Sequence, residues 1–323
     1  TDPGVPSPDM GVVDPEDTIA DEGKSVYFES FRFPTEPVMD LPLAEDDAVP
    51  TFRAPVISAG FIVNQLVPEV SVGEDADGEP TFTETDRMIF ENARRLVIMT
   101  HIDNCEADEA GAPYTFGFMY KQGIYTQGGP SDMYIRLNTG FTYADSEMNE
   151  LFEPALNVSS HEVVLDADEK FTDEIIWDPL YMTDHLSWTV PADNTFSPRG
   201  WLRGADVFTA FEYTPSWDQS SHGCLPNKFH FNGTTNGAWE NGPVVISKVR
   251  GPCVSTLDPR IKAAPKGKNT DGIVSDLGNK DVIHMVYGTY DMETGEELDL
   301  FYTWSHDRGL TWDVLNKDVD GEV

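Results

Sequence analysis

The sequence predicts an all-β protein, and three features of the chain support this fold class. From Thr51 onward, short apolar and aromatic runs of strand length alternate with turns rich in Gly, Pro, Asn and Asp. Helical periodicity is weak throughout, and the best helical candidate is the stretch Thr85–Arg95. Near the end of the chain, the aromatic run Leu298–Trp304 leads into Ser305–Trp312, a sequence typical of a tight β-hairpin.

The residues Ser305–Trp312 (S-H-D-R-G-L-T-W) predict a turn that is stabilised by its own side chains. Asp307 can accept hydrogen bonds from N–H groups of the turn, and Gly309 can adopt the positive φ that a tight turn needs. Thr311 and Trp312 then begin the next strand, with the indole available to cover the base of the hairpin. An ordinary hairpin that matches the pattern by chance is the alternative interpretation.

The strands predicted around this turn form one antiparallel unit. They comprise a short strand at Asp258–Ile261, then Val282–Tyr287, Leu298–Trp304 and a strand that begins at Thr311. Four antiparallel strands in about 50–60 residues is the size of one β-propeller blade.

Two earlier groups of strands resemble this unit. One contains Arg203–Tyr213 and Lys228–Phe231, followed by a turn that places Trp239 where Trp312 stands in the last unit. The other contains Arg95–Thr100, Tyr114–Tyr120 and Asp132–Leu137. Residues 51–323 are therefore predicted to form one β-propeller domain, either complete with about six four-stranded blades or incomplete.

Residues 1–50 differ from the rest of the chain. Prolines alternate with Asp, Glu and Gly, and neither the strand nor the helix period is present. We expect an extended, acidic and Pro-rich N-terminal arm, with one strand within Ser25–Phe33.

Several segments resemble the choice-of-anchor O family of bacterial surface proteins, and the resemblance extends from about Phe52 to the end of the chain. The segments are Glu91–Ile98, Met119–Gly123, Leu202–Gly204, Tyr213–Pro215 and Asp258–Arg260. This resemblance implies a large, secreted, sialidase-like protein with a variable C-terminal anchor, and it implies no settled activity. Ser305, Asp307, Gly309, Thr311 and Trp312 match the Asp-box, or BNR repeat, which in sialidase-like propellers is a structural turn, usually away from the active face.

The composition fits an extracellular protein. The chain has 57 acidic and 21 basic residues, a net charge of −36, which opposes binding to nucleic acid or to anionic membranes. This acidity suits a halophilic or marine bacterium, although an acidic surface without environmental meaning is the alternative. No apolar run reaches the roughly 18 residues of a membrane span. The chain opens at Thr1 without a signal peptide, as we expect of a secreted protein after cleavage.

The three cysteines allow one disulfide and one remaining thiol. We expect Cys224 to pair with Cys253, because both lie beside turn residues and flank the second strand group. Cys105 is then free or joined to another chain. The alternative is that His222, Cys224 and His230 bind a soft metal ion.

Arg53 is the first candidate for chemistry. Phe52-Arg53-Ala54-Pro55 is similar to the F/Y-R-I-P motif of sialidases, in which the arginine holds the substrate carboxylate. Arg203 and Arg250 could complete an arginine triad, but Ala54 replaces the isoleucine and no Tyr–Glu pair can be assigned. The favoured interpretation of Arg53 is a strand residue paired with a carboxylate.

Calcium is the second candidate. Asn316, Asp318 and Asp320 match the first half of a calcium-binding loop, in which alternating oxygen ligands converge and Gly321 permits the turn. Asp75 and Asp77, with Glu84 further along, form a weaker version. The alternative is that a chain this acidic produces such runs by chance.

These features together predict a secreted or cell-surface propeller that is more a binder than a catalyst. We expect a binding or assembly module in an extracellular complex, with other surface subunits, further copies of itself or glycans as partners. A sialidase-type glycoside hydrolase acting on carboxylated sugars is the alternative.

Overall fold

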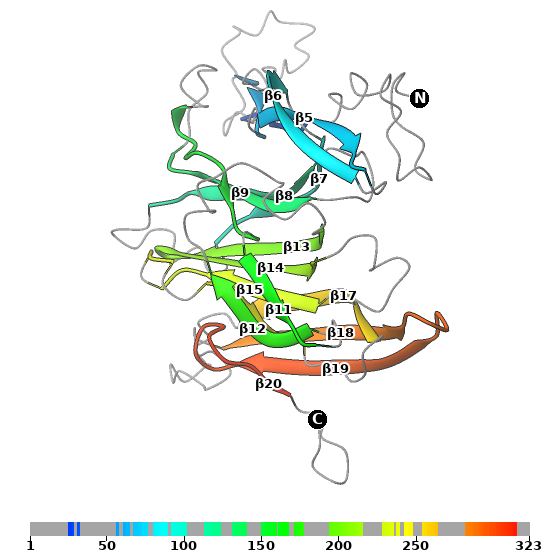
Figure 1. The fold of residues 1–323 in the computed structure, drawn as a ribbon. Coiled ribbons are helices and arrows are strands. Elements are labelled where there is room, and N and C mark those ends of the chain that lie inside the picture. Colours follow the sequence, from blue (N-terminus) through cyan, green and yellow to red (C-terminus); the bar gives the residue numbers. More distant parts are fainter. Residues whose placement is uncertain are drawn as a thin grey trace, which may run out of the picture.

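A computed structural model shows the fold of the chain (Figure 1). It describes residues 25–28, 31–32, 56–57, 61–64, 67–76, 80–89, 92–101, 113–123, 131–140, 150–159, 161–167, 171–177, 194–215, 228–235, 237–239, 242–247, 254–263 and 282–314. Every secondary-structure element assigned within these ranges is a β-strand, so the predicted all-β class is confirmed.

Three four-stranded sheets form the main part of the structure. The first sheet consists of β7 (Asn92–Met99), β8 (Phe116–Gly123), β9 (Asp132–Asn138) and β10 (Leu156–Asn157). The second consists of β13 (Asn194–Arg203), β14 (Asp206–Thr214), β15 (Lys228–Gly233) and β16 (Val244–Val245). The third consists of β17 (Val254–Ala263), β18 (Ile283–Asp291), β19 (Glu297–Ser305) and β20 (Asp313–Val314). In each sheet the strands are antiparallel and neighbours in chain order, and none of the described sheets closes on itself.

The other strands form four two-stranded antiparallel pairs. Two hairpins are β5 (Val67–Glu74) with β6 (Pro80–Ile89), and β11 (His161–Leu165) with β12 (Phe171–Trp177). Two short pairs are β1 (Tyr27–Phe28) with β4 (Phe61–Ile62), and β2 (Phe31–Arg32) with β3 (Val56–Ile57). The strand predicted within Ser25–Phe33 is thus present as β1 and β2.

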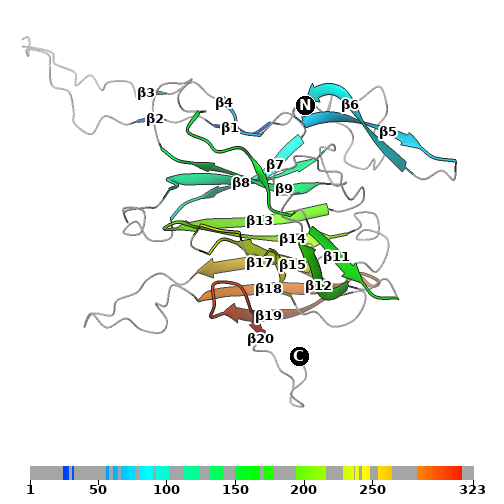
Figure 2. The ribbon, with the colours of Figure 1, turned by 60° about the vertical axis from the view of Figure 1, so that its left-hand side comes forward.

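The three large sheets stack face to face in chain order (Figures 1 and 2). Residues such as Met119 and Ile135 of the first sheet pack against Leu202 and Phe211 of the second. Burial of such side chains stabilises the fold by about 1.5–3 kcal/mol each.

A second apolar layer joins the second and third sheets. Phe229 and Phe231 of the second sheet pack with Ile283, Met285 and Tyr287 of the third. Because both faces of the second sheet are covered, every side chain of β14 is buried. This double coverage explains why β14 has large apolar side chains on both of its faces, with Phe211 in the cluster with the first sheet and Phe208 in the cluster with the third.

A third apolar cluster lies on the face of the first sheet that points away from the second. It contains Phe118 and Tyr120 of β8 together with Val26, Phe28 and Val63. The backbone N–H of Val63 donates to the carbonyl of Val26 (2.7 Å), and that of Val26 donates to Asn64 Oδ1 (2.9 Å). Residues 25–28, within the predicted arm, therefore cover the first sheet.

The three sheets share one irregularity in their first strand. In each sheet, a segment of the first strand lies opposite a segment of the second strand that is one residue shorter. The pairs of segments are Arg94–Val97 opposite Met119–Lys121, Phe196–Arg199 opposite Ala210–Glu212, and Leu257–Arg260 opposite Val286–Gly288. Each is a β-bulge with one extra residue, which bends the strand and increases its twist. The bulges supply a common reference for comparing positions between the sheets.

A stacked aromatic pair recurs beside each bulge. It joins the second and third strands at directly opposed positions, as Tyr120–Tyr134, Phe211–His230 and Tyr287–Phe301. The ring centroids are 6.1, 6.0 and 5.5 Å apart and the interplanar angles are 14°, 14° and 13°. The shared bulge and ring pair identify the three sheets as copies of one structural unit.

Two tryptophans also occupy matching places. Trp312 packs between the second and third sheets, and Trp239 packs against the cluster between the first and second. This agrees with the predicted equivalence of the two residues.

The strands predicted in the third sheet are confirmed. Val282–Tyr287 corresponds to β18 and Leu298–Trp304 to β19, and these strands are adjacent and antiparallel. Asp307 lies in the turn between β19 and β20. The short strand predicted at Asp258–Ile261 is part of a longer one, β17, whose bulge falls at Asp258 and Pro259.

One predicted strand starts too early, and the helical candidate was wrong. The strand expected at Arg203–Tyr213 is β14, which begins at Asp206, because the chain turns at Gly204, which has a φ of 57°, between β13 and β14. The helical candidate Thr85–Arg95 falls instead in strands β6 and β7, which pair with β5 and β8. Its helical spacing was weak, and pairing with neighbouring strands determines its conformation.

Candidate functional site

Buried polar side chains gather at one end of the first two sheets, in a group that we call the lysine cluster: Lys121, Ser131, Asn194 and Thr195. Lys121 is near the end of β8, Ser131 precedes β9, and the other two begin β13. All four side chains are at least nine-tenths buried. Because neighbouring strands run in opposite directions, these strand ends meet at the same end of the stack.

Hydrogen bonds converge on Asn194 in this cluster. Lys121 Nζ and Ser131 Oγ each donate to Asn194 Oδ1, both at 2.7 Å. Thr195 Oγ1 donates to the Ser131 carbonyl at 3.2 Å. Lys121 Nζ also lies 4.2 Å from the centroid of the Phe196 ring. The amide oxygen and the ring face stabilise the buried ammonium, and the contacts tie the first sheet to the second.

Ser159, which directly follows the core residue Val158, lies beside Asp132 and Met133 at the start of β9. Its Oγ accepts from the backbone N–H of Met133 (2.9 Å) and lies 2.8 Å from Asp132 Oδ1. Ser247 takes the same place in the second sheet, where its Oγ accepts from the N–H of Phe229 (2.9 Å). Because a serine hydroxyl accepts a backbone hydrogen bond at the same place in both sheets, its role is structural: it continues the hydrogen bonding at the sheet edge.

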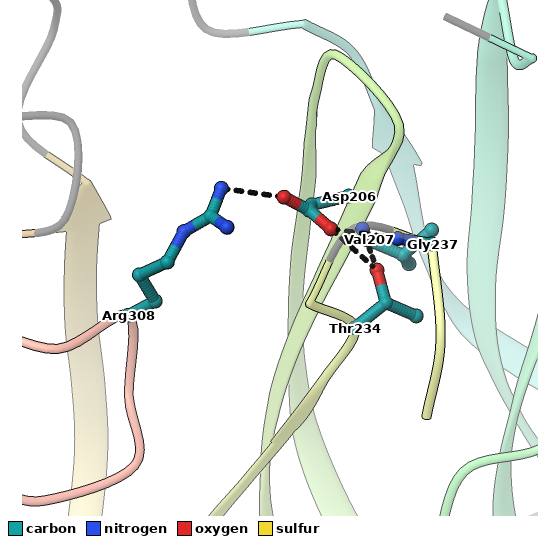
Figure 3. Close-up of polar contacts among 5 residues, drawn as sticks. All are labelled: Asp206, Val207, Thr234, Gly237 and Arg308. Atoms are coloured by element: carbon teal, nitrogen blue, oxygen red, sulfur yellow. Dashed lines mark hydrogen bonds and ion pairs between the residues drawn. The ribbon is translucent and has the colours of Figure 1, made fainter. Parts of the chain in front are cut away.

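A second polar group lies at the opposite end of the stack and joins the second and third sheets. We call it the aspartate clamp, and Figure 3 shows it. Asp206 Oδ1 accepts from Thr234 Oγ1 (3.2 Å) and from the Gly237 N–H (3.0 Å). Its other oxygen forms an ion pair with the guanidinium of Arg308. Thr234 Oγ1 in turn accepts from the Val207 N–H (2.8 Å).

Arg308 belongs to the turn that the sequence predicted at Ser305–Trp312. Asp307 Oδ1 accepts from the Thr311 N–H (2.9 Å), and Ser305 Oγ accepts from the Gly309 N–H (2.8 Å). Gly309 has a φ of 97°, and the Trp312 indole donates to the Gly309 carbonyl (2.9 Å). The positive φ and the side-chain hydrogen bonds expected from the sequence are therefore present.

The carboxyl group of Asp307 is electrostatically adapted to this turn. Partial burial favours its neutral form, but hydrogen bonds from the hydroxyl and N–H of Thr311 and from the Ser305 hydroxyl outweigh that effect. The pKa of Asp307 consequently lies below its ordinary value. The ionised carboxylate of Asp307 is therefore the form that accepts the hydrogen bonds of the turn.

Arg136 is a third buried cation. It is 8% exposed, and its guanidinium donates to the carbonyls of Val63 (2.8 Å) and Glu153 (3.2 Å). Burial lowers the pKa of Arg136, and it also raises the pKa of the neighbouring Tyr120 above its ordinary value. Arg136 thereby ties the segment 61–64 to the first sheet.

The structure places one arginine of the predicted triad. Arg203 ends β13, is 3% exposed, and lies beside the aspartate clamp. Arg53 and Arg250 lie outside the described residues. The Arg203 position is therefore at the end of the sheets that carries the Ser305–Trp312 turn.

Among the predicted calcium ligands, Asp75 and Glu84 are described. Asp75 is exposed and directly follows β5, whereas Glu84 lies opposite Val70 within the β5–β6 hairpin, four residues along β6 from Pro80. At about 3.3 Å per residue, this spacing separates Glu84 from the hairpin turn by roughly 13 Å. Asp77, Asn316, Asp318 and Asp320 lie outside the described residues.

The cysteine predictions also fall outside the described part of the chain, since Cys105, Cys224 and Cys253 are all in other segments. His230, the alternative metal ligand, is fully buried in β15, where its Nδ1 lies 3.1 Å from the Lys228 carbonyl. Within the described ranges, no group of three or more His, Cys, Asp and Glu side chains is arranged to hold a metal ion. The same ranges contain no helix long and apolar enough to cross a membrane.

Sequence reasoning did not find the lysine cluster or the aspartate clamp. Their members are single polar residues separated by 73 positions for Lys121 and Asn194 and by 102 for Asp206 and Arg308. The one available signal was a charged residue inside an apolar strand, as Lys121 is in β8.

No protein-family model matches the chain, and comparison with curated proteins also finds no match.

Proposed function

We propose that this chain is a secreted or cell-surface β-propeller of the sialidase-like type, without catalytic activity, that serves as a binding or assembly module in an extracellular complex. The support for the propeller is the recurrence of one four-stranded unit in three successive sheets. Repetition of such a unit around an axis is how propellers are built, and the resemblance to choice-of-anchor O proteins favours the same architecture.

One observation carries the non-catalytic assignment. In three places, charged groups that are wholly or largely buried bridge packed elements: Lys121 joins the first and second sheets, Arg308 with Asp206 joins the second and third, and Arg136 holds the segment 61–64. Catalysis of glycoside hydrolysis requires charged groups to converge on a substrate. In this protein these charged groups instead connect packed elements of the fold to one another.

The position of Arg203 also supports a binding module. It is buried opposite Asp206, which pairs with Arg308 of the Ser305–Trp312 turn, and in sialidase-like families this kind of turn is usually away from the active face. A substrate-binding arginine must reach the ligand carboxylate with its planar fork. Arg203 at this end of the stack therefore favours the structural role.

A fluorogenic sialoside assay tests this assignment. The protein is expected to release no fluorophore above a heat-denatured blank, with an active sialidase as positive control, and Arg53→Ala is expected to change nothing. Hydrolysis that is abolished by Arg53→Ala would establish the sialidase alternative, because Arg53 is the credible carboxylate-binding residue of the predicted triad.

A labelling experiment tests the location. Intact producing cells are treated with a membrane-impermeant amine-reactive biotin, and the medium is collected. We expect the protein to be biotinylated or present in the medium, while a cytosolic marker protein stays unlabelled. Recovery of the unlabelled protein from the cytosol alone would contradict the proposal.

A further inference from the structure

Lys121 on β8 of the first sheet and Asn194 at the start of β13 of the second form a side-chain pair that is almost completely buried. Their exposed fractions are 1% and 2%, and Lys121 Nζ lies 2.7 Å from Asn194 Oδ1. Lysine is among the side chains that are least often buried to this extent. A primary amine held against a side-chain amide, away from water, is the arrangement from which an amide bond between two side chains can form.

The amine of Lys121 is within reach of the carbonyl carbon of Asn194. Because a C=O bond is about 1.2 Å long, Nζ lies at most about 3.9 Å from Cγ. Reacting atoms in a productive geometry are about 3–3.5 Å apart. The terminal torsion of an asparagine side chain is broad, so a small rotation of the amide turns the face of its carbonyl group toward Nζ. The fold thus supplies the proximity that an amine and an amide lack in solution.

Ser131 polarises the same carbonyl group. Its Oγ is fully buried and donates to Asn194 Oδ1 at 2.7 Å. When an amine adds to the carbon, negative charge develops on this oxygen, and a fixed donor in a water-excluded place stabilises that charge. Thr195 Oγ1 donates to the Ser131 carbonyl at 3.2 Å, which helps to hold Ser131 in position. Ser131 is therefore placed to lower the barrier to attack.

The surroundings of the pair suit this reaction. The ring of Phe196 covers Lys121 Nζ, with the centroid 4.2 Å away. Burial excludes the water that would otherwise hydrolyse the amide. Two buried acids at neighbouring positions can carry the proton that the amine must release before it attacks. Asp132, which follows Ser131, is 3% exposed, and Glu212, which lies opposite Phe196, is 6% exposed.

We propose that Lys121 and Asn194 join in an isopeptide bond, an amide bond between their side chains, which links the first sheet covalently to the second. The Nζ–Cγ bond forms and the Cγ–Nδ2 bond of Asn194 breaks. Two protons of the Lys121 ammonium end on the departing nitrogen, which leaves as ammonium, so the step needs neither an oxidant nor a co-reactant. The bond spans 73 positions of the chain and, unlike a disulfide, withstands reductants. Its formation depends on the folded chain alone and not on the proposed function.

Intact-mass spectrometry of the full chain, reduced and denatured, tests the bond. The wild-type mass is expected to be lower than that of the sequence by one ammonia. A tryptic digest should contain a branched peptide that joins Lys121 to Asn194, and trypsin should not cleave after Lys121. Peptide mapping is needed because Asn-Gly sequences such as Asn232-Gly233 also lose ammonia when they cyclise to a succinimide.

Three variants test the assigned roles. Lys121→Arg keeps the positive charge but removes the amine, and Asn194→Ala removes the amide, so each should have the full mass of its own sequence. Ser131→Ala should contain unlinked chain when freshly purified, because loss of one such donor slows comparable reactions by about 10²–10³-fold. Lys228→Arg is the matched control and should keep the ammonia loss, since Lys228 is a buried lysine at the same end of the stack.

A wild-type chain with the full sequence mass would overturn the proposal. An ammonia loss that maps to other residues, or that persists in Lys121→Arg, would do the same. Because the mass is read on the wild-type protein, the result stands even if a variant fails to fold. A reducing, denaturing gel gives a second measurement: the linked wild type should migrate faster than Lys121→Arg, since a closed loop keeps the unfolded chain more compact, and equal migration would contradict the bond.

Discussion

Arg308, in the turn after β19, forms an ion pair with Asp206 at the start of β14, although the two residues are 102 positions apart in the sequence. The pair joins the third sheet to the second at the end of the stack where the Ser305–Trp312 turn lies. Asp206 also accepts two hydrogen bonds from the loop that follows β15. One carboxylate thus holds three segments of the chain together.

The ion pair is expected to contribute measurably to stability, because both side chains are largely buried. Their exposed fractions are 6% for Asp206 and 18% for Arg308. A double-mutant cycle with Asp206→Asn and Arg308→Met should give a coupling free energy of about 1–3 kcal/mol. The measurement is urea unfolding of the four proteins, and additive single effects would show that the pair contributes little.

Gly309 is expected to be intolerant of any side chain. Its φ is 97°, and a Cβ at this position would overlap the ring of Phe231 in the second sheet. Gly309→Ala should therefore cost more than the strain of about 1–2 kcal/mol that a positive φ alone imposes. Gly295→Ala is the matched control, since Gly295 has a φ of 72° and no atom within 4 Å of its added Cβ. Equal urea midpoints for the two variants would refute the packing role of Gly309.

The stability contributed by Asp307 should depend on pH in the acid range. Its folded-state pKa is depressed, so the contribution is fully present above the unfolded value of about 3.9 and is lost as pH falls through the folded-state pKa. Asp307→Asn should destabilise the protein at pH 7, and the difference from wild type should shrink as the pH falls below about 4.

Thr311→Val is the companion to this test. It removes the hydroxyl that donates to Asp307 and keeps the shape of the side chain. The pH-dependent part of the stability should then be smaller than in wild type. Identical acid unfolding curves for wild type, Asp307→Asn and Thr311→Val would rule out the proposed role of the carboxylate.

Calcium should stabilise the protein more than sodium does. A ligand that binds only the folded state at a hundredfold excess over Kd adds about 2.7 kcal/mol, whereas NaCl of matched ionic strength offers screening alone. Millimolar Ca²⁺ should thus raise the Tm further than matched NaCl. Asp318→Asn with Asp320→Asn should abolish the difference if the site is there, and Asp75→Asn with Asp77→Asn tests the second candidate. Superimposable melting curves in the two salts would mean that no specific site exists.

Cys224 and Cys253 are expected to form a disulfide, with Cys105 excluded from it. Closing a loop of this length would stabilise the fold by about 3–4 kcal/mol in the chain-entropy model. Peptide mapping under non-reducing conditions should link the peptides that contain Cys224 and Cys253. A linkage from Cys105 to either one would show that the assignment is incorrect.

The local structure of this protein follows from residues that are close together in the chain. The sequence correctly predicted the all-β class, the strands β8, β9, β18 and β19, and the hydrogen-bonded turn around Asp307 and Gly309. These features could be predicted because strand patterning and turn chemistry depend on residues close together in the chain. The same local reasoning placed the start of β14 too early, because the turn at Gly204 directly follows Arg203, the last residue of β13. It also failed at Thr85–Arg95, where pairing with β5 and β8 overrides a weak helical spacing.

The packing of one sheet on the next depends instead on contacts between residues that are distant in the sequence. The bulges of the second and third sheets share a Pro-Arg pair, Pro198-Arg199 and Pro259-Arg260, but the first sheet has Leu96-Val97 at these positions. The stacked pairs combine Tyr, Phe and His, so the unit common to all three sheets becomes clear only when the register is known. Lys121 with Asn194, and Asp206 with Arg308, meet because sheets distant in sequence pack face to face. Contacts of this kind depend on the three-dimensional arrangement of strands, and single residues separated by 73 or 102 positions carry no local pattern that predicts them.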